Sequence, residues 1–345
     1  PGLSLLGVVP YAIAEYGLRR VFPDDIARQV LFSTYCTNLC TTVLCGVVLC
    51  LTLFHILTFF FRLDQTAAVI ATLICGLGTL LFSYSTTLYS HVPAASFSFV
   101  SFAGTMHIRH GTARNKNLIA LGAGIAASLA MFIEPSTVLT LGLIFVYLVS
   151  CREGRRYGAF FIAGCLPAGI MQCYYNAVCF GGPFNSSYDY ANDMVMARVN
   201  GKLFGVPRLG NIAGLLVLPY RGLFVSSPIY LMALPGIFLL FRKWRAEAVF
   251  CAGVSLLFLL YIAGFYAWYG GSTVGPRYLV PAYPFAFVLT VCVLRRFRKL
   301  FMLVGMVSII INLSITIIGN EIPGEIKNPL KDAILKNLLD GKVSI

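Results

Sequence analysis

The chain has 345 residues, of which 58% are hydrophobic and only 11% are charged. A soluble domain usually carries about 25% charged residues, so this composition excludes an ordinary soluble fold. Apolar runs of about 20 residues, the length that crosses a bilayer, recur along the sequence and predict a polytopic membrane protein. The formal net charge of +13 therefore does not require nucleic acid as a partner, because basic residues at the ends of membrane helices account for most of it.

The first segment, residues 1–34, is predicted to be an external juxtamembrane element. Its apolar start is interrupted by Gly7, Pro10 and Gly17, which favours a partial span or an interfacial helix. The stretch PDDIARQ that follows is typical of a helix start, with Asp24 as its capping residue.

The region 35–319 is predicted to form an all-α membrane bundle of about ten spans with external loops and juxtamembrane helices. Loops with clustered Lys and Arg are separated by two spans each, so all of them can lie on the cytoplasmic side, as the positive-inside rule requires. Hydropathy places the spans at roughly 36–61, 66–86, 92–107, 118–133, 136–150, 158–179, 222–241, 247–268, 278–294 and 300–319.

The opposite, external face collects the longest polar segments. Loop 180–221 is the longest, and a loop of that length in a compact protein is usually functional or disordered; its aromatics and glycines favour an ordered cap. The tail 320–345 contains NPLKDAILKNLLDG, with Asn328 as N-cap, Pro329 at the first helical position and Gly341 as the stop. It predicts a short amphipathic helix on the external surface.

The stretch YAWYGGSTVGPRYLVPAYPF holds the sharpest candidate site. Its one charged residue, Arg277, stands at the mouth of a span and presents a planar fork that suits phosphate. Gly270 and Gly271 allow the backbone to approach a ligand closely. Trp268 and Tyr269 offer faces for sugar stacking or for an interfacial aromatic belt. The alternative is a lipid headgroup anchor with an aromatic belt.

Further cations on the external face also run against the positive-inside bias. Arg221 is predicted to join Arg277 in binding phosphate, although contact with lipid headgroups is an open alternative for all of them. The others are Arg198, Lys202 and Arg208.

Three titratable residues on this face are candidate catalytic groups. Glu134, placed between two apolar spans and before Pro135, is a candidate base, metal ligand or arginine partner; the alternative is a loop charge that meets water. His91 could ligate a metal or contact phosphate, but a lone histidine at a helix boundary is more often structural. Asp189, with Asp193 four residues on, could supply a carboxylate base.

Soluble nucleotide chemistry has no support in the sequence. It contains no phosphate-binding P-loop, no HExxH and no GxSxG. The cofactor is therefore not assigned: a divalent metal stays open, but there is no convincing cluster of metal ligands.

Four stretches, in this order, resemble the GT-C superfamily of integral-membrane glycosyltransferases, specifically the bacterial glycosyltransferase 39 (protein O-mannosyltransferase) and aminoarabinose transferase group. They are PGLSLLGVVPYAIA at Pro1, TTLYSHVPAASFSF around His91, YYNAVCFGGPFNSSY before the long loop, and WYGGSTVGPRYLVPAYPF around Arg277. The resemblance covers most of the chain.

The resemblance implies an enzyme that moves a sugar from a polyprenyl-phosphate donor to an acceptor on the outer face of the bacterial inner membrane. Arg277 would bind the donor phosphate, and Trp268 and Tyr269 would border the sugar. The lipid tail would lie along apolar helices, so membrane lipids and the lipid-linked donor are the implied partners. A protein partner stays unassigned.

The sequence departs from this family at the catalytic base. The resemblance implies an aspartate in the first external loop, upstream of the segment that matches Pro1. His91 stands near the place of the acidic residue of the family's second loop. We therefore expect either that the N-terminal catalytic loop is missing from this sequence or that the protein is a degenerate relative.

Two other functions stay open. Glu134 and the spans interrupted by glycine and proline are compatible with a transporter or lipid flippase. The missing aspartate is compatible with a non-catalytic assembly subunit.

Overall fold

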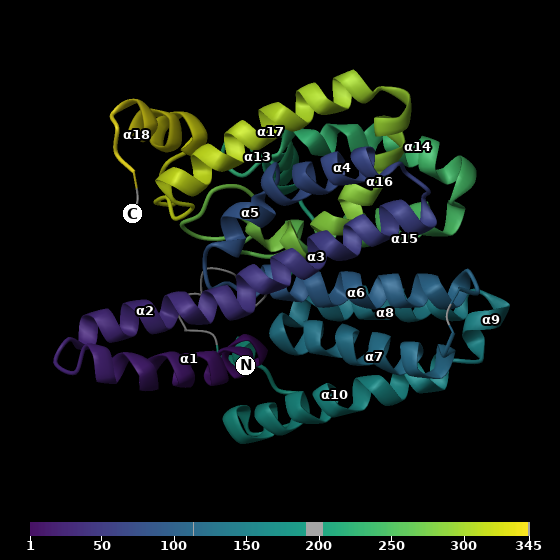
Figure 1. Cartoon of the computed structure of the whole chain (residues 1–345), viewed down its shortest axis with the longest axis horizontal. Helices are drawn as coiled ribbons and strands as arrows, with labels where there is room; N and C mark the ends of the chain where they lie inside the picture. The colour runs from purple at the N-terminus through teal and green to yellow at the C-terminus, as the bar shows by residue number, and fades with distance from the viewer. Residues whose placement is uncertain (113, 191–202, 344–345) are drawn as a thin grey trace.

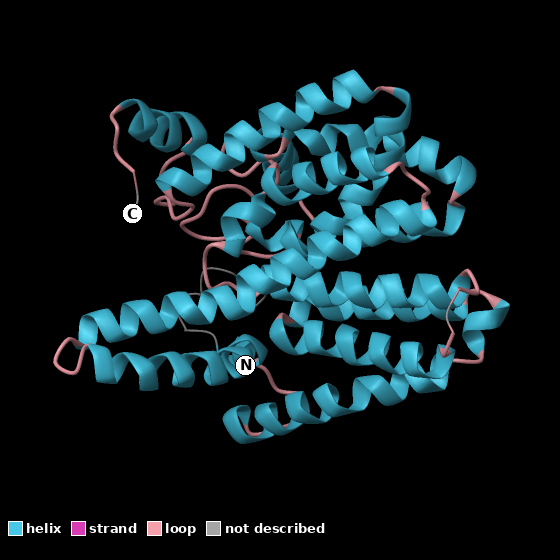
Figure 2. Ribbon diagram, in the orientation of Figure 1, coloured by secondary structure: helices cyan, strands magenta, loops and turns pink. Residues whose placement is uncertain are grey.

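A computed structural model describes residues 1–112, 114–190 and 203–343 (Figure 1). Over these residues the regular structure is helical, with no strand and one isolated bridge between Phe204 and Phe265 (Figure 2). This confirms the predicted all-α class. The ordered cap expected over loop 180–221 falls partly on residues 191–202, which lie outside the described residues.

The chain begins with a helical hairpin that projects from one end of the bundle (Figure 1). Helix α1 (Gly2–Val21) turns into α2 (Ile26–Asn38), which Asp25, not Asp24, caps by accepting a hydrogen bond of 2.9 Å from the Arg28 amide. The second helix does not end near residue 34, where we expected a boundary. No proline interrupts it, and it continues through η1 (Leu39–Val43), α3 (Leu44–His55) and η2 (Ile56–Phe60).

Four antiparallel helices form one side of the bundle: α6 (His91–Arg109), α7 (Lys116–Ile133), α8 (Val138–Val149, after the short η3, Pro135–Thr137) and α10 (Gly158–Phe180). The short α9 (Arg152–Arg155) links the last two. Helices α7 and α10 cross with their backbones almost touching: a Cβ on Gly124 would lie 2.0 Å from the Phe161 carbonyl oxygen, and one on Gly164 would lie 2.1 Å from that of Leu121. Small residues at a crossing are a usual way to pack membrane helices.

The other side of the bundle contains the central helix and its neighbours (Figure 1). The segment Arg277–Arg296, formed by η6 (Arg277–Ala282) and α16 (Tyr283–Arg296), is buried over 83% of its apolar stretch. Around it are α4 (Gln65–Leu77), α5 (Leu80–Ser85), α12 (Leu209–Leu216), α13 (Leu223–Ser226), η5 (Pro228–Met232), α14 (Ala233–Lys243), α15 (Arg245–Ala263) and α17 (Arg298–Ile318).

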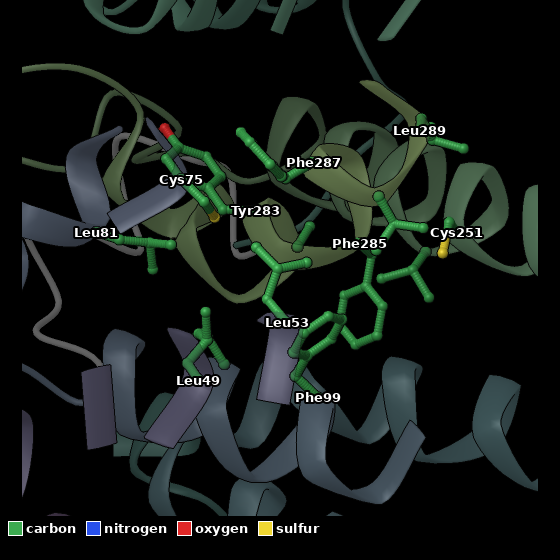
Figure 3. Packing of buried hydrophobic residues seen from close by; sticks show 14 of the residues in the cluster. Leu49, Leu53, Cys75, Leu81, Phe99, Cys251, Tyr283, Phe285, Phe287 and Leu289 are labelled. Carbon is green, nitrogen blue, oxygen red and sulfur yellow. The ribbon is translucent and has the colours of Figure 1, made fainter. Parts of the chain in front are cut away.

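Aromatic residues hold the two sides together (Figure 3). Phe285 of α16 packs edge-on against Phe99 of α6, with ring centroids 5.4 Å apart, and Phe102 stacks on Phe250 of α15 at 4.5 Å. Such pairs contribute beyond the area that they bury.

Six helices of the described chain are long and apolar enough to cross a membrane, which indicates a multi-pass membrane protein. They are Ile26–Phe60, Lys116–Ile133, Gly158–Phe180, Arg245–Ala263, Arg277–Arg296 and Arg298–Ile318.

The remaining four expected spans differ from these, so the count of ten stays a prediction. The expected span 66–86 is divided between α4 and α5 at Gly78 and Thr79, and 222–241 is divided among α13, η5 and α14 at Ser227. The expected span 136–150 corresponds to a shorter apolar helix, and that of 92–107 to α6, whose serines and histidines lower its hydropathy.

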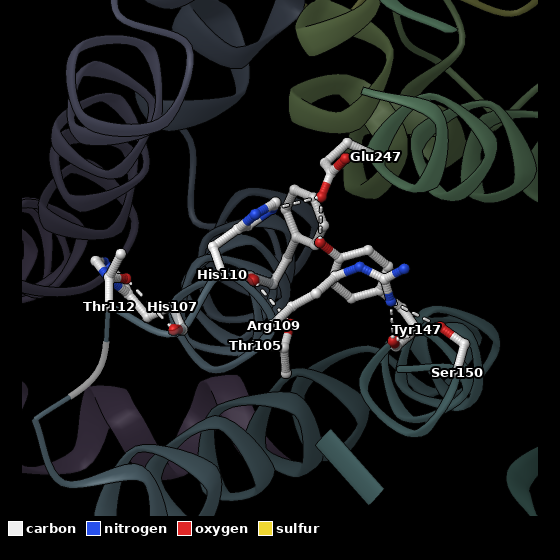
Figure 4. A network of polar contacts seen from close by, with 9 residues as sticks. Thr105, His107, Arg109, His110, Thr112, Tyr147, Ser150 and Glu247 are labelled. Carbon is white, nitrogen blue, oxygen red and sulfur yellow. Dashed lines mark hydrogen bonds and ion pairs between the residues drawn. The ribbon is translucent and has the colours of Figure 1, made fainter. Parts of the chain in front are cut away.

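A polar network lies at the end of the bundle where α6 ends and α15 begins (Figure 4). The carboxylate of Glu247, only 2% exposed, accepts a hydrogen bond of 2.7 Å from the Tyr147 hydroxyl and contacts His110 Nε2 at 2.8 Å. Arg109 donates to the Tyr147 carbonyl and to Ser150. Because each of these polar groups has a partner, this network ties α6, α8 and α15 together.

The tail folds as predicted at its start. Asn328 accepts from the Lys331 amide at 3.3 Å, and the helix runs through η7 (Leu330–Leu335) and α18 (Lys336–Leu339). Gly341, at φ +67°, follows its end. Ala333 and Ile334 are buried, so this helix packs on the body of the protein with one face.

Candidate functional site

The loop between α15 and η6 is shaped by glycines. Gly270, Gly271 and Gly275 have φ angles of +76°, +74° and +69°, which side chains rarely adopt. A Cβ on Gly270 would lie 3.1 Å from Cγ of Arg277. The loop therefore closes over the Arg277 side chain, whereas the predicted approach of this backbone to a ligand stays a prediction.

Arg277 lies between two tyrosine rings. Its guanidinium carbon is 5.3 Å from the ring centroid of Tyr89 and 5.0 Å from that of Tyr278, and Nη2 donates to the Tyr278 hydroxyl at 3.3 Å. Its Nε is buried without a hydrogen-bond partner, and no ion pair joins it to a carboxylate of the described residues. A buried cation without an anion is costly near hydrocarbon.

His91 and Glu134 meet where α6 begins and α7 ends. His91 Nδ1 is 3.1 Å from Glu134 Oε2, within the distance of an ion pair when the imidazole is protonated. The hydroxyl of Ser90 donates to the same oxygen, and Ser136 donates to Oε1 at 3.4 Å. Burial raises the pKa of Glu134, but His91 and the two hydroxyls more than offset it, so the pKa lies below its ordinary value.

The two groups are parts of one cluster. The His91 ring stacks on Tyr89 at 6.1 Å and meets the edge of Tyr278 at 5.6 Å. Tyr89 and Tyr278 are also the residues that hold Arg277. We call Tyr89, His91, Glu134, Arg277 and Tyr278 the Arg277 cluster.

A residue that sequence reasoning missed joins this cluster from the start of the tail. The Tyr89 hydroxyl donates a hydrogen bond of 2.8 Å to Oε1 of Glu321. Desolvation and this hydrogen bond raise the pKa of Tyr89 above its ordinary value. The neighbouring Asn320 donates to Ser83 and accepts from the Val274 amide at 2.9 Å, which fixes the tail against the glycine loop. The signal was its position: Glu321 is the first charged residue after the last span.

Arg221, predicted to join Arg277 in binding phosphate, is engaged by backbone carbonyls of its own chain. It is fully buried, and its Nε and Nη2 donate to the carbonyls of Tyr269 and Gly271, each at 2.7 Å, while Nη1 donates to that of Tyr220 at 2.9 Å. With its nitrogens occupied in this way, Arg221 holds the glycine loop from below. Burial lowers its pKa from the ordinary value, but arginine stays charged.

Trp268 and Tyr269 take different positions. The Trp268 ring packs on α12, where a Cβ on Gly214 would lie 2.4 Å from it. It also lines a cavity of about 580 Å³ together with Arg208, Asn211 and Tyr266. Tyr269 is 37% exposed. Arg277 is not among the residues that line this cavity.

None of the described contacts of Asp189 joins it to the Arg277 cluster. Its carboxylate accepts from the amide and hydroxyl of Ser186, at 2.6 and 3.3 Å, and so caps a local turn at η4 (Ser187–Tyr190). Asp193 lies outside the described residues, as do Arg198 and Lys202. Among the described residues, no group of three or more His, Cys, Asp and Glu could hold a metal ion.

Comparisons of the chain with protein-family models, with curated proteins and with solved structures found no match.

Proposed function

We propose that this protein is a membrane glycosyltransferase that moves a sugar from a polyprenyl-phosphate donor to an acceptor on the outer face of a bacterial inner membrane. The observation that carries the proposal is the state of Arg277: a partly buried guanidinium between two tyrosine rings, with no carboxylate partner among the described residues.

The partners of the two candidate carboxylates support a phosphate as the anion for Arg277. Glu134 is engaged by His91, Ser90 and Ser136, and Asp189 by Ser186. A phosphate offers oxygens that a planar guanidinium binds in pairs. Because Arg277 opens η6 at the mouth of a span, a lipid phosphate reaches it at the level of the membrane surface.

In the proposed reaction, an acceptor hydroxyl or amine attacks the anomeric carbon while the bond from that carbon to the phosphate oxygen breaks. Polyprenyl phosphate leaves with the electron pair and takes up the proton that the acceptor releases, while Arg277 stabilises the charge that develops on the phosphate as the bond breaks. Glu134 fixes the His91 ring, which in turn packs on Tyr89 beside Arg277. Trp268 and Tyr269 are proposed to border the sugar.

The test uses the whole protein in proteoliposomes with a panel of polyprenyl-phosphate sugars and membrane acceptors. We expect transfer or donor hydrolysis with at least one donor. Arg277→Lys keeps the charge but loses the paired fork, so donor affinity falls about tenfold, near 1.4 kcal/mol. Absence of turnover across the panel, together with equal donor binding by wild type and Arg277→Lys, contradicts the proposal.

A lipid flippase or transporter is the second candidate. The observation that favours it is the pair of interrupted helical segments, α4–α5 and α13–η5–α14, because discontinuous helices are common at transport sites. A saturable flux of labelled polyprenyl-phosphate sugar across liposomes, without any transfer product, selects this function over glycosyl transfer. Stoichiometric capture of a protein partner without donor binding selects instead a non-catalytic assembly subunit.

A further inference from the structure

Four cationic side chains line a single cavity at the opposite end of the central helix from Arg277. The cavity has a volume of about 570 Å³, and the cations are Arg62, Lys243, Arg295 and Arg298. They come from three separate corners of the fold: the connection between η2 and α4, the end of α14, and the connection between α16 and α17. We propose that this cavity binds the phosphate of an anionic phospholipid headgroup, or a free phosphate, at the membrane surface opposite the Arg277 cluster.

The charge balance inside the cavity favours an anion. Asp64 is the one carboxylate among its lining residues, and it caps α4 by accepting a hydrogen bond of 2.9 Å from the Ala67 amide. No ion pair of the described residues involves any of the four cations. Four positive side chains against one carboxylate leave three charges without a counterion from the protein.

The backbone at Arg62 supports a role for its side chain. Arg62 has a φ of +54°, the only positive value at a non-glycine residue in the described chain. It ends the long helix in the manner of a C-terminal cap: Phe61 and Leu63 donate to the carbonyls of Ile56 and Leu57, at 3.1 and 3.0 Å. Glycine is the usual residue at such a position, so an arginine there gives up backbone stability to place a cation at the cavity.

The cavity is also expected at the depth of a headgroup. Arg295 is near the end of the segment Arg277–Arg296, which is apolar enough to cross a membrane. Its guanidinium donates to the Phe61 carbonyl, which holds the two corners together. Leu63 and Leu294 supply apolar walls beside the cations. Basic pockets between membrane helices are a known way to hold lipid phosphate.

A purely topological role is the competing explanation, since basic residues mark the cytoplasmic ends of spans in any case. That role needs only the number of charges, whereas a binding site needs these charges at this place. Lys243→Gln/Arg298→Gln removes two cations of the cavity. Arg152→Gln/Arg156→Gln removes two exposed cations of the same expected face that do not line it, and is the matched control.

The experiment titrates the purified whole protein, in detergent, with short-chain phosphatidylglycerol, short-chain phosphatidylcholine and inorganic phosphate, with calorimetry as the readout. We expect saturable binding of phosphatidylglycerol that is about tenfold weaker in Lys243→Gln/Arg298→Gln and unchanged in Arg152→Gln/Arg156→Gln. Arg62→Gln is a second, single-site variant with the same expected direction.

Inorganic phosphate separates the two sources of the anion. If it binds as tightly as phosphatidylglycerol and shows the same dependence on the variants, the ligand is a free phosphate group; if it binds far more weakly, the ligand is the lipid. Equal affinity of all variants for every probe, or loss of binding in the control pair as well, overturns the proposal.

Discussion

Tyr89 and Glu321 are joined by a hydrogen bond of 2.8 Å across 232 positions of the chain. The bond holds the ring on which the Arg277 guanidinium rests. It therefore connects the segment after the last span to the Arg277 cluster, and the tail is part of the candidate site as well as a surface element.

The first prediction tests this connection. We expect Tyr89→Phe and Glu321→Gln, each alone, to weaken the binding of polyprenyl phosphate. The loss of binding free energy in the double variant is smaller than the sum of the two single losses, by a coupling energy of about 0.5–1 kcal/mol. Binding titrations of the four proteins measure it. Tyr266→Phe, on the loop between α15 and η6, is the control and leaves affinity unchanged. If the two single losses of binding free energy add up to the loss in the double variant, the hydrogen bond does not contribute to phosphate binding.

Glu134 gives a prediction about acid stability. Its pKa in the folded protein lies below the ordinary value of 4.5, so its contribution is complete above that pH and is lost as the pH falls through the folded-state pKa. Thermal unfolding from pH 6 to pH 3 measures this loss. We expect Glu134→Gln to be less stable than wild type at pH 6 and to show a shallower decline below about pH 4.5. Parallel curves for the two proteins exclude the contribution.

The two arginines of the site are predicted to respond differently to substitution. Arg221→Met leaves three carbonyls without their donor, so we expect a loss of about 3 kcal/mol in the free energy of unfolding. Arg277→Met removes a cation that lacks an anion in the protein, and stability changes by less than about 1 kcal/mol while phosphate affinity falls. Chemical unfolding in detergent compares them; similar losses for both would mean that Arg277 also supports the fold.

Gly270 is predicted to be required for the loop. An alanine there combines a φ of +76° with a Cβ 3.1 Å from Arg277 Cγ, and we expect a loss of about 1 kcal/mol or more together with weaker phosphate binding. Gly253→Ala, in α15 with no atom near its Cβ, is the matched control and changes neither quantity. Wild-type binding by Gly270→Ala counts against the closed loop.

The crossing of α7 and α10 gives a prediction about the fold. Gly164→Ala places a methyl group 2.1 Å from a carbonyl oxygen, so the helices must separate, at a cost of about 2 kcal/mol. Gly169→Ala, on the same helix with open space around it, is expected to be neutral within about 0.5 kcal/mol. Unfolding curves of the two variants check the contrast, and equal stability would rule out the close crossing.

Sequence patterns predicted local features better than contacts between distant segments. The cap at Asn328 and six of the ten expected apolar spans follow from local residue types, and the structure contains them. The contact of Tyr89 with Glu321 and the burial of Arg221 depend on how helices far apart in the chain pack. No local pattern distinguishes an arginine that donates to backbone carbonyls from one that faces a ligand.

Some of the predicted helix boundaries were wrong for a related reason. Hydropathy ends a span where polar residues begin, but the backbone hydrogen bonds of Ile26–Phe60 continue through polar Ser33, Thr37 and Asn38 because no proline or turn stops them. Conversely, hydropathy predicts one span over the apolar run 66–86, although the helix is interrupted within it at Gly78 and Thr79.

The hairpin of α1 and α2 is attached to the rest of the protein at two places. The first attachment is the continuous helix Ile26–Phe60, which is about 52 Å long at 1.5 Å per residue. This length exceeds the hydrocarbon thickness of about 30 Å. The second attachment is Gly2, where a Cβ would lie 2.7 Å from the amide nitrogen of Ile133. Ile133 directly precedes Glu134. The start of α1 therefore packs directly on the last turn of α7, and a side chain at position 2 would displace the turn that precedes Glu134.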